Sequence, residues 1–155
     1  MASDDNVVEL DDAEEGLNSQ AALGLIGYRL RRAQLSVFQR FLTVFDSLGL
    51  RPAEYLVLVL VDENPGRKQS EIAAALGIKR ANFVALAQAL EARGLLERLS
   101  IETDRRANAL HLTASGRVFL AKARRLHDQL ENDFVERLGG DSGREQLLTL
   151  LERLT

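Results

Sequence analysis

The sequence predicts a mainly α-helical fold that contains one small β-hairpin. Over most of the 155 residues, apolar side chains recur every three or four positions, which is the period of helices packed on a core. After Gly94 the period changes to two, which is typical of strands. Because 46% of the residues are hydrophobic, the chain can form one domain with its own core.

The first predicted helix covers residues 18–48. Its apolar residues fall on two stripes at helical spacing: Leu23, Ile26, Leu30, Val37, Phe41, Val44, Phe45 and Leu48, and then Tyr28, Leu35, Phe38 and Leu42. A helix that is apolar over more than one face cannot be covered by a single neighbour. We therefore expect it to pack both on its own domain and on a second copy of the chain.

The second predicted helix begins at Pro52 and ends before Asn64-Pro65-Gly66. Its run of seven apolar residues from Tyr55 to Val61 would also suit a strand. Pro52 fits the first turn of a helix, and the stop after it favours a helix of about 12 residues. The run is only about a third of the roughly 20 residues that cross a bilayer, so we expect it to be buried.

Two short helices come next, over 69–76 and 79–93. Gly77 separates them and Gly94 ends the second, whose apolar residues Phe83, Leu86, Ala87 and Leu90 follow helical spacing. This pattern predicts a helix-turn-helix. Helical pairs of this kind also occur as plain structure, so the pattern alone does not establish DNA binding.

Residues 96–112 alternate as strands do, with a charged tip inside a long loop between 96–101 and 109–112. Thr113 is placed to cap a long helix that runs to Leu138 and is broken by Gly139-Gly140. Ser142 and Glu145 have the spacing of a capping box, which predicts a last helix from there.

The formal charge of −3 is unevenly distributed along the chain. Residues 1–16 contain seven acids and no base, which leaves 16 acids and 20 bases in residues 17–155. The sequence thus predicts a disordered acidic tail over 1–16 and a single, mildly basic domain over 17–155. A basic body is compatible with a polyanionic partner.

The sequence lacks the residues that several classes of protein function require. The chain has no cysteine, and neither His111 nor His127 has a partner at metal-ligand spacing, so we expect no metal site and no cofactor. Gly140-Asp-Ser-Gly143 resembles a serine-protease stretch, but it lies between predicted helices and Ser142 fits a capping role. No nucleotide-binding loop is present. We expect no enzyme activity and, without a secretory signal or membrane span, a cytoplasmic protein.

The order of helix, helix, hairpin and long helix, flanked by long helices at both ends, resembles the MarR family of winged helix-turn-helix regulators. The similarity covers the chain from about residue 20. It rests on Pro52-Ala-Glu-Tyr55 and Glu63-Asn-Pro-Gly66, on Gln69-Ser-Glu-Ile-Ala-Ala-Ala-Leu-Gly77, and on Leu90-Glu-Ala-Arg-Gly-Leu-Leu96. Asp104-Arg-Arg-Ala107 followed by Leu112-Thr-Ala-Ser-Gly116 is the most diagnostic part.

The resemblance implies a homodimer that binds double-stranded DNA. Residues 50–112 would form the winged helix-turn-helix, and 17–49 with 113–155 would form dimerisation helices. At the wing, it implies that Arg106 enters the minor groove, that Asp104 orients it and that Arg105 meets phosphate. A narrow minor groove concentrates negative potential and so favours an inserted arginine. The alternative is a solvated turn, in which an Asp–Arg pair contributes under ~1 kcal/mol.

The other DNA-facing candidates lie at the starts of the two short helices: Lys68, Gln69, Ser70, Lys79, Arg80, Asn82 and Phe83. Lys79 and Arg80 could meet phosphate or guanine, and Asn82 could pair with adenine. The sequence departs from the family at Ala81, Val84 and Ala85, where the family usually has polar or charged residues. We therefore expect few direct base contacts and more dependence on the wing and on DNA shape.

Basic residues occupy three expected helix starts, at Arg51, Lys68 and Lys79. Ser, Thr or Asp there would cap the helix, so each basic residue forgoes roughly 1 kcal/mol. We hypothesise that Lys68 and Lys79 meet DNA phosphates; alternatively Gln69 or Ser70 caps the first of these two helices.

Family resemblance also implies release of DNA by a small aromatic acid or its thioester. Tyr28, Arg31 and Arg32 offer an aromatic face and cations for such a ligand, although arginines on a long helix usually face solvent or pair with acids. The sequence therefore predicts a ligand-responsive homodimeric repressor of a pseudo-palindromic operator. The alternative is a winged-helix protein-interaction module that does not bind DNA.

Overall fold

The computed structural model describes residues 20–101 and 104–155, and the side chains of these residues outside 101–108. Its elements, in chain order, are α1 (Gln20–Leu23), α2 (Ile26–Phe45), η1 (Asp46–Leu48), α3 (Pro52–Glu63), α4 (Gln69–Ala75), α5 (Arg80–Ala92), β1 (Leu96–Ile101), β2 (Asp104–Leu112), α6 (Ala114–Arg137) and α7 (Asp141–Glu152). The two strands form one antiparallel sheet. The predicted fold class, mainly α with a β-hairpin, is confirmed.

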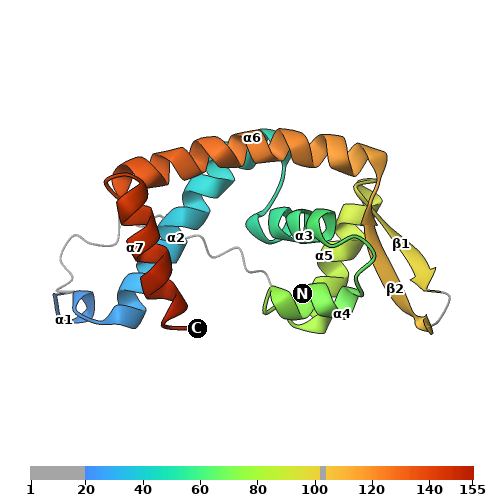
Figure 1. The fold of residues 1–155 in the computed structure, drawn as a ribbon, viewed down its shortest axis with the longest axis horizontal. Helices are drawn as coiled ribbons and strands as arrows, with labels where there is room; N and C mark the ends of the chain where they lie inside the picture. Colours follow the sequence, from blue (N-terminus) through green and yellow to red (C-terminus); the bar gives the residue numbers. More distant parts are fainter. Residues whose placement is uncertain (1–19, 102–103) are drawn as a thin grey trace.

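The long helix α6 runs along one side of the molecule and joins two parts (Figure 1). At one end lie α1, α2 and α7, which together with the C-terminal half of α6 we call the arm. At the other end lie α3, α4, α5 and the hairpin, residues 52–112, which we call the reader. The chain passes between the two parts twice: from η1 to α3 through residues 49–51, and from β2 to α6 at Thr113.

A single hydrophobic core occupies the reader and continues into the nearby ends of α2 and α6. Its largest fully buried side chains are Phe45, Phe83, Leu58, Leu90, Leu110, Leu120, Val57 and Val61. The rings of Phe41 and Phe45 stack with their centroids 3.8 Å apart, and both contact the ring of Tyr55 on α3. The arm beyond this point has little core of its own, since α1 and α7 contain no buried residue.

Residues 52–63 form a helix and not a strand. The chain turns at Gly49, whose φ of 52° lies in the left-handed region, and Pro52 is the first residue of α3. Both ends of α3 therefore match the sequence prediction. No helix within residues 20–101 and 104–155 is long and apolar enough to cross a membrane.

The single helix expected over 18–48 is wrong in part. The helix is interrupted at Gly24 and Leu25, and its last turn, Asp46–Leu48, is a 3-10 helix. Glycine is a poor helix former, and Leu25 has extended backbone angles of φ −89° and ψ 126°. Arg29 compensates for the break, because its Nε donates to the Leu23 carbonyl at 2.8 Å.

The long hairpin loop expected around the charged tip is also wrong. Strand β2 begins at Asp104, which pairs with Ile101, so only residues 102–103 separate the strands. A register shift between Ser100 and Ile101 lets the ladder continue to the tip. The backbone of Asp104, Arg105 and Arg106 therefore belongs to a strand.

The predicted start of α6 is confirmed, whereas that of α7 is not. The Thr113 hydroxyl accepts a hydrogen bond from the Gly116 amide at 2.9 Å and so caps α6. Helix α7 begins at Asp141 with Gly140 as its N-cap, at a φ of 96°, so Ser142 lies inside the helix. The expected capping box of Ser142 and Glu145 is wrong because Gly139 and Gly140 turn the chain before Ser142 is reached.

Candidate nucleic-acid interface

A tight turn at Gly77 sets the geometry of the helix-turn-helix. Gly77 has a φ of 63°, and its amide donates to the Ala74 carbonyl at 3.0 Å. The Ile78 amide donates to the Ala73 carbonyl at 3.0 Å, which satisfies the end of α4 while the chain reverses. Ile72 and Ala73 are buried on α4, so the helix is fixed on the core and α5 starts at the surface.

Helix α5 has one buried face and one exposed face. Phe83, Ala87 and Leu90 are each 0% exposed and anchor it to the core. The exposed face is short and carries few functional groups: Arg80, Ala81, Asn82, Ala85, Gln88, Ala89 and Ala92. The prediction that Phe83 contacts DNA is therefore wrong, because its ring is fully enclosed by the core. Gln88 was missed, although the helical spacing of Phe83, Ala87 and Leu90 places it on the opposite face of the helix.

The three basic residues expected at helix starts are N-caps in the structure. Arg51 precedes α3, Lys68 precedes α4 and Lys79 precedes α5, and none makes a side-chain capping hydrogen bond. The alternative in which Gln69 or Ser70 caps α4 is thus wrong, because α4 begins at Gln69 itself.

At two of these helix starts, a glutamate in the first turn compensates for the missing side-chain cap. Glu54 Oε2 accepts from the Arg51 amide and Glu71 Oε2 accepts from the Lys68 amide, each at 2.8 Å. At the start of α5 the corresponding residue is Asn82, and Lys79 is exposed there. The N-terminus of α5, with its partial positive charge, is thus flanked by Lys79 and Arg80 at the surface.

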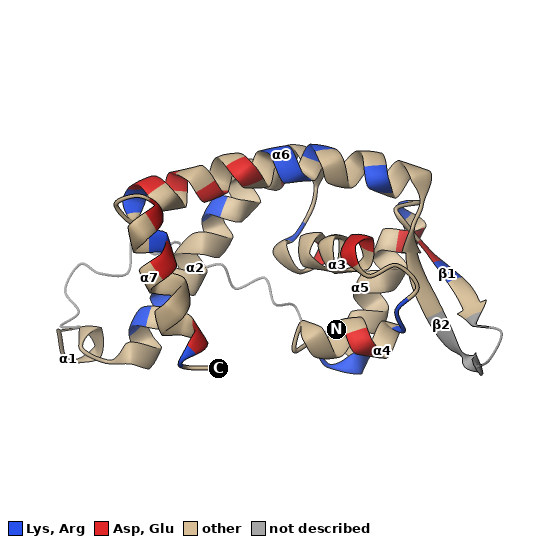
Figure 2. Ribbon diagram, viewed as in Figure 1, with Lys and Arg blue, Asp and Glu red and all other residues tan. Residues whose placement is uncertain are grey.

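The basic start of α4 lies against the hairpin. The Gly66 amide donates to the Leu110 carbonyl and the Leu110 amide donates to the Arg67 carbonyl, both at 3.0 Å. Lys68 forms a β-bridge with Ala109. The hairpin base, Arg67 and Lys68 are therefore neighbours, and Figure 2 shows basic residues where α4 and α5 begin.

The side chains of Asp104, Arg105 and Arg106 lie outside the described part of the chain, so their predicted roles rest on the sequence. An ion pair connects β1 of the hairpin to α5. Arg98 on β1 lies 3.0 Å from Glu91 on α5, measured from Nη2 to Oε2. Both side chains are largely buried, so this ion pair joins the hairpin to α5.

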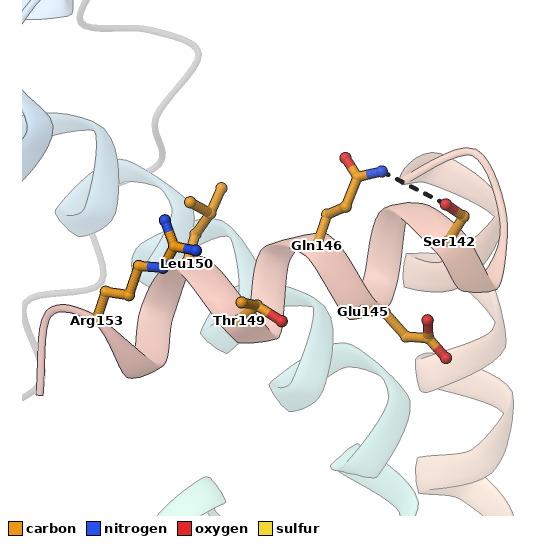
Figure 3. Close-up of a pocket in the computed structure, with 6 residues that line it drawn as sticks. All are labelled: Ser142, Glu145, Gln146, Thr149, Leu150 and Arg153. Atoms are coloured by element: carbon orange, nitrogen blue, oxygen red, sulfur yellow. Dashed lines mark hydrogen bonds between the residues drawn. The ribbon is translucent and has the colours of Figure 1, made fainter.

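The ligand candidates Tyr28, Arg31 and Arg32 all lie on α2 in the arm. Tyr28 and Arg32 are half-buried and Arg31 is exposed. An open groove of about 420 Å³ lies elsewhere, along α7, and is lined by Ser142, Glu145, Gln146, Thr149, Leu150 and Arg153. Figure 3 shows that its side chains come from one helix, with Gln146 directed toward Ser142. The structure does not bring this groove together with the three predicted residues.

Two further features were not anticipated. Tyr55 stacks on His127 of α6 with ring centroids 4.7 Å apart, and burial raises the pKa of the Tyr55 hydroxyl above its ordinary value of 10.0. Arg93, at the end of α5, donates to the carbonyls of Leu48 and Gly49.

Among the described residues, no group of three His, Cys, Asp or Glu side chains is placed to hold a metal ion.

Comparison with known proteins places this arrangement in a family. Residues 48–107 match the model described as MarR family. The regulatory protein proposed for the hcr operon of Thauera aromatica is 36% identical over 132 residues, which are 84% of this chain and 79% of that protein.

Two solved structures of a transcriptional repressor, CouR, share the fold along almost their whole length. CouR bound to a 23-mer DNA duplex gives a TM-score of 0.83 at 45% identity and covers 89% of this chain and 97% of its own. CouR bound to p-coumaroyl-CoA gives a TM-score of 0.81 at 44% identity and covers 89% and 96%. The helix-turn-helix, the hairpin and the similarity to these relatives show that the chain belongs to the MarR family of winged helix-turn-helix transcriptional regulators.

Proposed function

We propose that this regulator is a homodimeric repressor that binds a pseudo-palindromic operator through α5 and the hairpin. The observation that carries the proposal is the cluster of exposed basic residues at the starts of α4 and α5, beside the hairpin. A repressor with 45% identity was solved on duplex DNA, which supports the same partner here. In a two-fold dimer, the two α5 helices would reach half-sites about 10 base pairs apart.

Within each half-site, the starts of the two helices have separate roles. Lys68, Gln69 and Ser70 at α4 contact the phosphate backbone and fix the register. Lys79 and Arg80 contact phosphate or a guanine edge. Asn82 pairs with adenine, and the alanines on the exposed face of α5 allow only contacts with thymine methyl groups.

The hairpin supplies the remaining affinity from the minor groove. Arg106 enters the groove, Asp104 orients Arg106, and Arg105 contacts phosphate. The Arg98–Glu91 ion pair supports this arrangement because it joins β1 to the helix that would lie in the major groove.

The arms form the dimer interface. Helix α7 contains no buried residue, and four leucines in or just after it are each more than a third exposed: Leu147, Leu148, Leu150 and Leu154. Ile26, Leu30, Val37 and Phe38 on α2 are exposed as well. An apolar surface of this extent is typical of a protein–protein interface.

The effector is a small aromatic acid or its thioester, and Tyr28, Arg31 and Arg32 contribute to its site. The structure of CouR with p-coumaroyl-CoA supports this class, since that ligand is an aromatic acyl thioester. The arginines would meet the phosphates of such a ligand and Tyr28 its aromatic or apolar part.

A protein-interaction module without DNA binding is the second candidate. The alanine-rich exposed face of α5 favours it, because few of those side chains can read base edges. The relatives are named as transcriptional regulators, which supports the repressor and argues against an enzyme.

The deciding experiment measures binding of the purified protein to the intergenic DNA beside its own coding region, across a salt series. We expect tight, salt-dependent binding that Arg106→Ala weakens about tenfold or more. Arg125→Ala serves as the matched control, since Arg125 is an exposed arginine on α6 outside the reader. A folded protein that does not bind DNA at low salt would favour the interaction module.

The effector is tested on the resulting DNA complex. We expect p-coumaroyl-CoA to release the DNA and the double substitution Arg31→Ala, Arg32→Ala to raise the concentration required. Acetyl-CoA is the control for the CoA portion alone. Equal release of DNA from the double variant and the unaltered protein would remove these arginines from the proposed site.

The acidic residues 1–16 weaken nonspecific DNA binding by competing with DNA for the basic surface. Seven negative charges attached to a body of about +4 would compete with DNA most strongly at low salt, where screening is weak and charges interact over longer distances. We expect deletion of residues 1–16 to tighten nonspecific binding at low salt. An unchanged affinity for nonspecific DNA would contradict this role.

A further inference from the structure

We infer that Arg93 is a positioning residue that fixes the orientation of the reader relative to the arm, and so the separation of the two α5 helices in a dimer. The inference rests on the proposed function where it concerns DNA. Arg93 is the C-cap residue of α5, at the opposite end of the helix from Lys79 and Arg80. It is therefore placed to act through the direction of α5 and not through contact with DNA.

Arg93 binds the first connection between the arm and the reader. Its Nη1 donates to the Gly49 carbonyl at 3.0 Å and its Nη2 donates to the Leu48 carbonyl at 2.9 Å. These carbonyls belong to the turn that ends η1 and leads into α3. A guanidinium presents its N–H groups in a rigid plane, so two simultaneous hydrogen bonds fix both position and angle.

A buried carboxylate completes the same contact from the side of α3. Glu54 is 8% exposed, its Oε2 lies 3.7 Å from Arg93 Nη1, and the same oxygen accepts from the Arg51 amide. The short connection from Leu48 to Arg51 is thus held at its start by Arg93 and at its end by Glu54. The low exposure of Glu54 strengthens the attraction between its charge and that of Arg93.

Arg93 also contacts α6, the helix that begins directly after the second connection at Thr113. Its Cζ lies 5.2 Å from the centroid of the Phe119 ring, on the helix that follows Thr113. One side chain from the end of α5 therefore contacts the first connection and the helix that follows the second. Without these interactions, α5 would remain folded on its core residues but would be less restricted in its angle to the arm.

The angle between α5 and the arm can be measured in the absence of DNA. Because the sequence contains no cysteine, spin labels attach only at cysteines that are introduced. Two spin labels are attached through Ala89→Cys on α5 and Gln129→Cys on α6, both exposed sites, and the labelled chain is diluted with unlabelled chain. We expect Arg93→Ala to broaden the distance distribution between the labels in the folded protein. Arg93→Lys should broaden the distribution too, since one ammonium group cannot replace the two guanidinium nitrogens that donate to separate carbonyls.

The effect of the Arg93 substitutions on DNA affinity is measured with a full operator and with a single half-site. We expect Arg93→Ala and Arg93→Lys to lower affinity for the full operator about tenfold or more and to change half-site affinity little, because only simultaneous binding depends on the spacing of the readers. Arg125→Ala is the charge-matched control. All comparisons are made where urea titration shows each variant to be folded.

Unchanged label distances in both Arg93 variants would overturn the inference. An equal decrease in affinity for the half-site and the full operator would overturn it as well, because it would mean that the reading surface itself was altered. If the unaltered protein binds no DNA, the proposed function fails, whereas the label distances still decide the role of Arg93.

Discussion

At the scale of single residues, close backbone contacts explain a glycine that the family motif contains. A Cβ atom added at Gly116 would lie 2.0 Å from the Leu95 carbonyl oxygen. The first turn of α6 therefore passes directly against the connection between α5 and β1. Thr113 lies at the same contact, since its hydroxyl donates to the Gly94 carbonyl at 2.6 Å. Together they fix where α6 leaves the reader.

We expect Gly116→Ala to lower the free energy of unfolding by about 1–3 kcal/mol, because the backbone of Leu95 must move to admit the methyl group. Urea titration followed by circular dichroism measures the change. The matched control is Gly27→Ala, where no atom lies within 4 Å of the added Cβ. That substitution should be neutral or stabilising by up to ~1 kcal/mol.

Tyr55 should make the protein less stable at alkaline pH. Burial raises the pKa of its hydroxyl, with neighbouring carboxylates adding to the effect and Arg124 opposing it. The folded state thus favours the neutral phenol, so its contribution is complete below the ordinary pKa of 10.0 and is lost as pH rises through the higher folded pKa.

Tyr55→Phe should therefore flatten the decline in unfolding free energy above about pH 10, with the ring stack on His127 retained. Urea titrations of both proteins between pH 8 and about 11.5 provide the comparison. Identical slopes would mean that Tyr55 does not titrate differently in the folded and unfolded states.

At the scale of elements, the three helix starts with a basic N-cap differ in how their backbone amides are capped. Lys68 and Arg51 have a first-turn glutamate that accepts from the N-cap amide, whereas Asn82 occupies that position after Lys79. Lys79 is thus the basic N-cap whose replacement should stabilise its helix most clearly, and it lies on the proposed DNA surface.

We expect Lys79→Ser to raise the free energy of unfolding by about 1 kcal/mol while it weakens DNA binding. The slope of log affinity against log salt should fall by roughly 0.9 for each phosphate that the variant no longer neutralises. Arg51→Ser is the control, because it would complete a capping box with Glu54 far from the start of α5. A stabilised Lys79→Ser protein with unchanged affinity and salt slope would refute the interaction of Lys79 with phosphate.

At the scale of the whole molecule, the arm leaves apolar side chains exposed. The core is concentrated in the reader and the adjoining ends of α2 and α6, while α1 and α7 bury no residue. A helix with exposed leucines on its surface gains stability when a second apolar surface covers it. The proposed dimer would supply that surface to both arms at once.

Two glutamates introduced together as Leu150→Glu and Leu154→Glu should dissociate the dimer, because each would place a charge in an apolar contact. Sedimentation velocity at several concentrations measures the change, and affinity for the full operator should fall with it. Val118→Glu is the control, since Val118 is 74% exposed on α6 near the reader. A dimer that survives both substitutions would exclude this segment from the interface.

The sequence by itself determined most elements of this protein. Periodicity, together with Pro52 and the glycines at 49, 77 and 94, predicted α3, α4, α5, β1 and the last part of β2, because these signals act through local backbone preferences. Thr113 likewise predicted the start of α6. The same kind of signal also predicted three features wrongly: a continuous first helix, which is interrupted at Gly24; a long hairpin loop, where β2 already begins at Asp104; and a cap at Ser142, which lies inside α7.

Tertiary structure alone decided which distant parts of the chain contact one another. Arg93 reaches carbonyls more than 40 residues away, and Gly116 meets Leu95 across the start of α6. Such contacts depend on how the chain returns to itself in three dimensions, and the periodicity of a single segment carries no information about that path.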